Sequence, residues 1–314
     1  MPHRCCRTYS NSRATTLAEL DKVTDLLIDA SLEPNSKKVY SRAWKMYADF
    51  CNSNHLLCSL PIPVRMLTRF ISFLFTKNYA ASTVRCMVSA LVQFHKMQSL
   101  PDPSLSILVQ KALHGLDKLR PSKLIRKPIT LEMIEKFTQS AHTMFDPYIA
   151  KLFSAMIALG FYALLRVGEM TGSKSRDTHC LFLSDVSLER NSVSVTFRDF
   201  KHNQGQAAVR TIKACKMQNS CPIYLLRQFL KVRGSIPGPL FIKVNGAPPY
   251  REEVLNWLLA VAKHNQIGSV GINTHSLRIG GATHLAKLGW SGERIRIFGR
   301  WKSDAYKKYI HSFN

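Results

Sequence analysis

Six residues that could act together on a phosphodiester are spread over the second half of the chain. An arginine follows a long apolar run in ALLRVGEM at 163–170, and a lysine lies in the turn sequence FRDFKHNQG at 197–205. A histidine and an arginine share THSLRIGGATHLAKLG at 274–289, and a tryptophan and a tyrosine share GRWKSDAYKKYI at 299–310. In chain order the six are Arg166, Lys201, His275, Arg278, Trp301 and Tyr309.

Together these residue types suit the cleavage of a phosphodiester. Two arginines can each donate a pair of hydrogen bonds to the non-bridging oxygens of the phosphate. A histidine and an indole N–H add donors, and a lysine can protonate the leaving oxygen. A tyrosine hydroxyl can attack as the nucleophile.

Each residue also has a plainer interpretation. Glu169 lies one helical turn after Arg166, so the two could form a purely structural ion pair. A lysine in a turn, such as Lys201, is usually a solvated charge, and a histidine three residues before an arginine is a weak signal. Trp301 brings an indole donor on a large apolar body, which can simply pack.

The stretch 274–289 is predicted to be a helix with both candidates on one face, because His275 and Arg278 are three residues apart. Thr274 is expected to cap it and to leave His275 in the first turn. There the arginine and the positive helix end disfavour a charged imidazole unless an anion is bound. Gly280 and Gly281 predict the close approach of another backbone.

The composition indicates a polyanionic partner. The chain has 44 Lys plus Arg against 20 Asp plus Glu in 314 residues, a formal net charge of +24. Residues 1–125 hold 17 basic and 8 acidic side chains and the remainder holds 27 and 12, so both parts are basic. This excess makes nucleic acid the first expected partner and an anionic membrane surface the second.

A transmembrane segment, a metal, another cofactor and a signal peptide are not expected. The apolar run LFSAMIALGFYALL at 152–165 is too short and interrupted to span a bilayer and indicates a buried helix. The eight cysteines are scattered without paired CxxC motifs, which argues against zinc and for reduced thiols. MPHRCCRTYS at 1–10 lacks the apolar segment of a signal peptide, so an intracellular protein is expected.

The first part of the chain is predicted to be all-helical. A short amphipathic helix is expected at 17–27, and Tyr40, Trp44 and Tyr47 recur at helical spacing as core residues. The basic, proline-marked stretch DKLRPSKLIRKP at 117–128 indicates a linker. We therefore predict a flexible N-terminus over 1–14, a helical domain over 15–122 and a second domain over 123–314.

The second domain is predicted to place a small antiparallel sheet among helices, so the whole chain is mainly α with one small β-sheet. Alternating, β-branched segments predict strands at 181–189, 192–200 and 207–214. Helices are expected at 130–141, 148–165, 222–233, 251–265, 276–288, 291–298 and 303–311.

Three motifs, ALLRVGEM, THSLRIGGATHLAKLG and GRWKSDAYKKYIH, resemble those of tyrosine recombinases. This phage-integrase-like superfamily shares its chemistry with type IB topoisomerases. The resemblance covers roughly residues 20–314, and GRWKSDAYKKYI is especially similar to recombinases of eukaryotic mobile elements of the DIRS/Ngaro or Crypton kind. It implies that the helical domain is a core-binding domain that closes a clamp around DNA, and that 123–314 is a recombinase catalytic domain.

Motif matching also implies a role for each candidate. Arg166 and Arg278 match the family's two catalytic arginines, and Glu169 matches the acidic residue that orients the first of them. Lys201 matches the hairpin lysine, and His275 matches the histidine before the second arginine. Trp301 takes the His/Trp position, and Tyr309 matches the nucleophile.

One interval departs from the family pattern. Trp301 and Tyr309 are eight residues apart, whereas nine is common in bacterial and phage members. Tyr306, one helical turn earlier, is therefore an alternative nucleophile.

The resemblance implies a site-specific recombinase or integrase that cuts and rejoins DNA through a 3′-phosphotyrosine, without metal or ATP, for a mobile element in the nucleus. Exchange between two duplexes needs four active sites, so we expect a monomer in solution and a homotetramer on double-stranded DNA. Two alternatives are a catalytically silent, domesticated DNA-binding protein with the same fold, and a monomeric nicking topoisomerase.

Overall fold

The computed structural model describes residues 16–121, 126–172, 180–198 and 206–310, without the side chains of Ala305, Lys308 and Tyr309. The chain divides into two compact units, Met1–Lys123 and Leu124–Asn314, each with its own apolar core. The described residues are mainly helical with one three-stranded antiparallel sheet, which confirms the predicted fold class.

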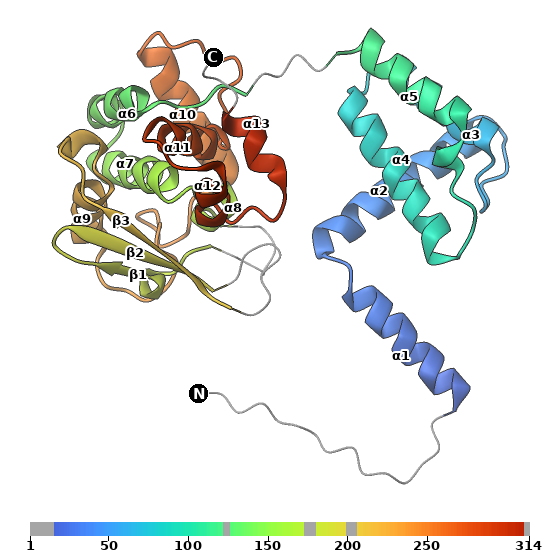
Figure 1. The fold of residues 1–314 in the computed structure, drawn as a ribbon, viewed down its shortest axis with the longest axis horizontal. Coiled ribbons are helices and arrows are strands. Elements are labelled where there is room, and N and C mark those ends of the chain that lie inside the picture. The colour runs from blue at the N-terminus through green and yellow to red at the C-terminus, as the bar shows by residue number, and fades with distance from the viewer. Residues whose placement is uncertain (1–15, 122–125, 173–179, 199–205, 311–314) are drawn as a thin grey trace. The chain divides into compact units, whose positions relative to one another are not determined.

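The first unit is built from helices, as the sequence predicts. Tyr47 is fully buried and its ring lies 5.4 Å from that of Phe70, so the predicted aromatic stripe does form the core. In contrast, the first helix buries none of its residues. The elements are α1 (Leu17–Ala30), α2 (Pro34–Ser53), α3 (Val64–Thr76), α4 (Ala81–Met97) and α5 (Ile107–Leu119) (Figure 1).

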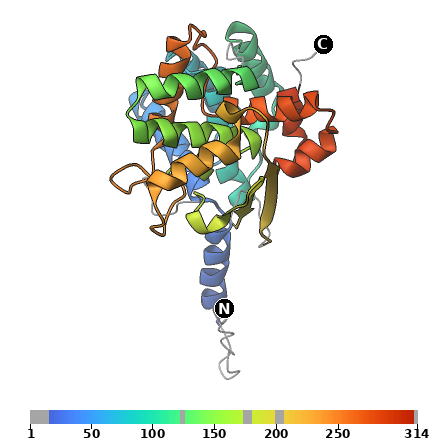
Figure 2. The same cartoon turned by 90° about the vertical axis from the view of Figure 1, so that its left-hand side faces the viewer.

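The second unit is organised around one buried helix, α7 (Pro147–Tyr162), which packs between α6 (Leu131–Met144) and α9 (Pro222–Arg233) (Figures 1 and 2). The remaining helices are α8 (Val167–Met170), α10 (Arg251–His264), α11 (Ser276–Lys287), α12 (Gly292–Phe298) and α13 (Lys307–Ile310). The expected helix 148–165 ends three residues early, and Leu164 has a left-handed backbone with φ 50°.

The sheet runs in the order β1-β2-β3, with β1 (Val186–Leu188), β2 (Ser192–Phe197) and β3 (Ala208–Lys213). Strand β2 alternates half-buried and buried residues, so its apolar face covers the core. The first strand is shorter than expected because Leu183–Asp185 form a 3₁₀ turn, in which the Asp185 carboxylate accepts the Phe182 N–H at 2.9 Å.

The end of the chain differs in detail from the expected helix at 303–311. Asp304–Tyr306 form a 3₁₀ turn, and the α-helix α13 covers only Lys307–Ile310 of the described residues. Over the ranges that the structure describes, no helix is long and apolar enough to cross a membrane, and no group of three His, Cys, Asp or Glu side chains could hold a metal.

Candidate active site

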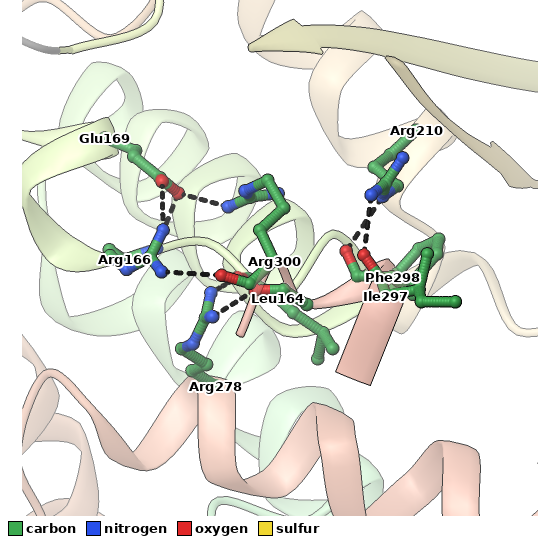
Figure 3. A network of polar contacts seen from close by, with 9 residues as sticks. Leu164, Arg166, Glu169, Arg210, Arg278, Ile297, Phe298 and Arg300 are labelled. Atoms are coloured by element: carbon green, nitrogen blue, oxygen red, sulfur yellow. Dashed lines mark hydrogen bonds and ion pairs between the residues drawn. The ribbon is translucent and has the colours of Figure 1, made fainter. Parts of the chain in front are cut away.

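Arg166 lies beyond the central helix, which ends at Tyr162 and not at the predicted residue 165. The left-handed turn at Leu164 redirects the chain, and Arg166 becomes the residue that precedes α8. Glu169, which is 5% exposed, accepts the Arg166 backbone N–H at 2.8 Å and its Nη1 at 3.1 Å. The predicted pairing of these two residues is confirmed (Figure 3).

Arg278 lies on α11 and is 1% exposed. Its guanidinium donates to the carbonyl oxygens of Leu164 and Gly299, which precede Arg166 and follow α12 respectively (Figure 3). The ring of Trp301 lies over the same guanidinium, 4.1 Å from ring centroid to Cζ. Arg278 therefore joins three segments that are far apart in the sequence.

Two glycines let α11 approach its neighbours closely. A Cβ at Gly280 would overlap the carbonyl oxygen of Ile129, and a Cβ at Gly281 would overlap that of Phe161 at the end of α7. The expected backbone contact is confirmed, and it fixes the depth at which Arg278 enters the unit.

His275 precedes α11 and is half-buried. Its backbone N–H is accepted by the Asn273 side chain at 2.8 Å. The expectation that Thr274 caps this helix is wrong, since its hydroxyl is buried without a hydrogen-bond partner among the described residues.

The imidazole of His275 is held neutral. Burial, together with the positive charges of Arg278, Arg126, Arg166 and Arg251, lowers its pKa to about 4. At neutral pH the ring can therefore accept a proton. This agrees with the expected effect of the neighbouring arginine on an uncomplexed site.

Trp301 and Tyr306 pack against one another and against the helices of the second unit. Tyr306 is 8% exposed, its ring lies 6.5 Å from that of Trp301, and a Cβ at Gly292 would lie 3.0 Å from it. Tyr306 is thus part of the packing beneath α12. Tyr309 belongs to α13, but its side chain is outside the described part of the structure, and so is the whole of Lys201.

Arg300 belongs to the same site, although no motif in the sequence singles it out. Its side chain is 1% exposed, its Nη2 donates to Glu169 Oε2 at 2.7 Å, and its Cζ lies 3.5 Å from the centroid of the Phe197 ring. Burial lowers its pKa to about 10, so the group remains charged at pH 7. The only signal was a basic residue between Gly299 and Trp301, in a stretch rich in basic residues.

Arg210 lies in strand β3 and binds the last residues of α12. Its Nε donates to the Phe298 carbonyl at 2.8 Å and its Nη2 to the Ile297 carbonyl at 2.6 Å (Figure 3). These two hydrogen bonds attach the end of α12 to the sheet, directly before the segment that carries Arg300 and Trp301.

The arginine cluster, defined as Arg166, Arg278 and Arg300, contains three guanidinium groups but one paired carboxylate, that of Glu169, which pairs with Arg166 and Arg300. Such an excess of buried positive charge favours an anionic ligand, since an anion offsets the desolvation of the guanidinium groups. With a neutral His275 beside it, the cluster can bind a phosphate and remove a proton from an attacking hydroxyl.

Comparison with known proteins supports a fold but gives no match in sequence. No protein-family model matches the chain, and no curated protein does. Among solved structures, the chain is similar to the XerH site-specific recombinase bound to palindromic difH substrate, with TM-score 0.65 and 16% identity over 95% of this chain and 82% of that one.

Two further structures have nearly the same similarity. The Tn1549 transposon integrase in complex with transposon right end DNA gives TM-score 0.64 and 15% identity over 93% of each chain. The lambda integrase dimer bound to a COC′ core site gives 0.61 and 14% over 93% of this chain and 75% of that one. The chain therefore has the fold of the tyrosine recombinases.

Proposed function

We propose that this chain is a tyrosine recombinase that cuts and rejoins double-stranded DNA. The observation that carries the proposal is the arginine cluster beside a neutral His275, in a unit with the recombinase fold. A generic basic surface would bind DNA equally well, but it would not require three guanidinium groups that converge from distant segments.

The reaction that fits these groups is an exchange of phosphoryl bonds. The Tyr309 oxygen attacks the scissile phosphorus and gives its proton to His275, while Arg166 and Arg278 stabilise the charge on the pentavalent phosphate. The bond from phosphorus to the 5′-oxygen breaks, and Lys201 supplies the proton to that oxygen. The products are a 3′-phosphotyrosine and a free 5′-hydroxyl, and attack by another 5′-hydroxyl reverses the step.

The proposal also includes the kind of DNA element that the chain acts on and the assembly in which it acts. The similarity of GRWKSDAYKKYI to recombinases of eukaryotic mobile elements supports integration or excision of such an element in the nucleus. Exchange between two duplexes requires four active sites, which supports a homotetramer assembled on DNA. The solved structures that the chain resembles include a dimer of lambda integrase bound to its core site.

The first unit is proposed to complete a clamp on the duplex. Its basic excess supports this role, and duplex affinity should then fall with salt by about −0.9 in log–log slope per phosphate neutralised. Residues 1–122 and 123–314 made separately should each bind more weakly than the intact chain. Equal affinity of the intact chain and the second piece would remove the clamp.

A suicide duplex with a nick close to the cleavage site tests the function. Loss of the short cleaved strand traps the covalent protein–DNA adduct, which gel electrophoresis in denaturant detects. The proposal predicts an adduct with the wild-type chain and none with Tyr309→Phe. Binding without an adduct would support the silent DNA-binding alternative, and an adduct that never joins two duplexes would support the nicking topoisomerase.

A further inference from the structure

Arg300 lies where three distant segments of the second unit meet. Its side chain contacts Glu169 of α8 and Phe197 at the end of β2, and its own segment leads from α12 to α13. The backbone at Arg300 is left-handed, with φ 59°, a conformation unfavourable for a long side chain. A strained backbone of this kind persists only where the surrounding contacts hold it in place, so the contacts of Arg300 are expected to have a specific role.

The short segment that Arg300 anchors also holds both of the other arginines in the cluster. The Gly299 carbonyl accepts from Arg278, and the Arg300 carbonyl accepts the Arg166 Nη2 at 3.1 Å. Two adjacent carbonyl groups therefore orient the two guanidinium groups that would bind the phosphate. Their position depends on whatever fixes residues 299 and 300.

The Arg300 side chain provides that fixation through the same carboxylate that holds Arg166. Glu169 Oε2 accepts the Arg166 backbone N–H at 2.8 Å and the Arg300 Nη2 at 2.7 Å, while Oε1 accepts the Arg166 Nη1 at 3.1 Å. Loss of the Arg300 guanidinium would leave Glu169 paired with Arg166 alone and would remove the side-chain link between residue 300 and α8.

We infer that Arg300 is a positioning residue that orients Arg166 and Arg278 toward the scissile phosphate, an inference that rests on the function proposed above. Arg300 acts through its neighbours and needs no contact with DNA. Its stacking on Phe197 further links the end of β2 to the segment that precedes the tyrosine helix.

The test measures the rate of adduct formation at saturating protein on two nicked duplexes, one with a normal phosphate and one with a neutral methylphosphonate at the cleavage site. Arg300→Met should lower the rate on phosphate by about 10- to 100-fold, because misplacement by about 1 Å is sufficient for such a loss. The loss should be clearly smaller on methylphosphonate, since less charge then needs to be stabilised. Duplex affinity should stay close to that of the wild type.

Two further variants keep the result interpretable. Arg300→Lys retains the charge but not the paired donors, so it should recover part of the rate and would carry the test if Arg300→Met failed to fold. Arg233→Met removes another buried arginine from the same unit, away from the cluster, and should leave the rate per folded molecule unchanged on both duplexes.

Equal losses on the two duplexes, or wild-type rates in the folded Arg300 variants, would overturn the positioning role. These outcomes differ from failure of the proposed function, in which the wild-type chain itself would form no adduct.

Discussion

Two regions of the second unit bury arginine, and they satisfy its charge in different ways. Arg233, at the end of α9, is 5% exposed and donates to four carbonyl groups of the loop that follows it, at 2.7 to 2.9 Å. The arginine cluster instead takes its partners from α8, α11 and the segment after α12, and two of its members share the carboxylate of Glu169.

The difference separates a structural arginine from a candidate binding site. Arg233 is held by neutral acceptors of one local loop, which is a way of ending a helix and ordering that loop. The cluster concentrates several positive charges from distant segments, and two of them, Arg278 and Arg166, add to burial in lowering the pKa of the nearby His275. Burial of an arginine is thus a weak sign of function, whereas convergence of several arginines on one point is a stronger one.

The largest expected effect that sharpens this comparison comes from Arg278→Met. Removal of a preorganised charge at the phosphate should lower the rate of adduct formation by about 10²- to 10³-fold. Arg233→Met should leave that rate unchanged and should lower the free energy of unfolding by about 1–3 kcal/mol, because it leaves buried carbonyl groups without a donor. Adduct kinetics and urea unfolding of both variants measure the two effects.

The comparison would break if Arg233→Met slowed adduct formation as much as Arg278→Met did. The two arginines would then have the same structural role.

The depth of α11, which carries Arg278, should depend on its glycines. Gly281→Ala would force a methyl group into the Phe161 carbonyl and should lower the free energy of unfolding by about 3 kcal/mol. The matched control is Gly115→Ala in α5, where a Cβ meets nothing within 4 Å. That change should raise stability by about 0.5–1 kcal/mol, as alanine does in a helix interior.

Urea unfolding followed by circular dichroism measures both glycine variants. A stabilised Gly281→Ala variant would contradict the close packing of α11 on α7.

The burial of His275, together with the charge around it, should also make stability depend on pH. Because the pKa of His275 is about 4 in the folded chain and near 6.5 when unfolded, the unfolded state binds more protons between these values. The contribution of His275 therefore lowers the free energy of unfolding as the pH falls from 6.5 to 4. Urea unfolding across this range should show a smaller decline for His275→Asn than for the wild type.

An unchanged pH dependence in His275→Asn would mean that burial and the neighbouring charges do not hold the imidazole neutral. No such pH dependence is expected from Arg233, since its hydrogen-bond partners are carbonyl groups, which do not titrate.

The smallest expected effect concerns the tyrosine outside the arginine cluster. Tyr306 is buried between Gly292 and Trp301, so Tyr306→Phe keeps the packed ring and removes only a hydroxyl. Adduct formation should remain close to that of the wild type, in contrast to the complete loss expected for Tyr309→Phe. A complete loss in Tyr306→Phe would instead identify Tyr306 as the nucleophile.

The sequence was sufficient for the features that depend on local spacing. The Arg166–Glu169 pair, the close approach at Gly280 and Gly281, and the aromatic core around Tyr47 all follow from positions a few residues apart or from residue size. The mainly helical fold with one small sheet was predicted on the same basis, from helical and alternating periodicities.

Features that depend on the backbone path or on distant partners could not be predicted in this way. Leu164 adopts a left-handed conformation that no local pattern indicates, so the predicted helix over 148–165 extends beyond the end of α7 at Tyr162. Arg300 is 131 residues from Glu169 in the sequence. Its side chain turns into the unit because its own backbone is left-handed. Capping by Thr274 was wrong because α11 begins only at Ser276, with His275 at the N-cap position, and the Ser276 N–H donates to the Asn273 carbonyl at 2.9 Å.

The central claim, that this chain cuts DNA with a tyrosine beside the arginine cluster, is tested most directly by mapping the covalent adduct. The wild-type chain is incubated with a nicked suicide duplex and digested. The peptide that carries a nucleotide linked through its 3′-phosphate is identified by mass spectrometry. We expect a single modified peptide with the phosphate on Tyr309, and no adduct in Arg278→Met over the same time. Bound but intact DNA, or an adduct on any other residue, would contradict it.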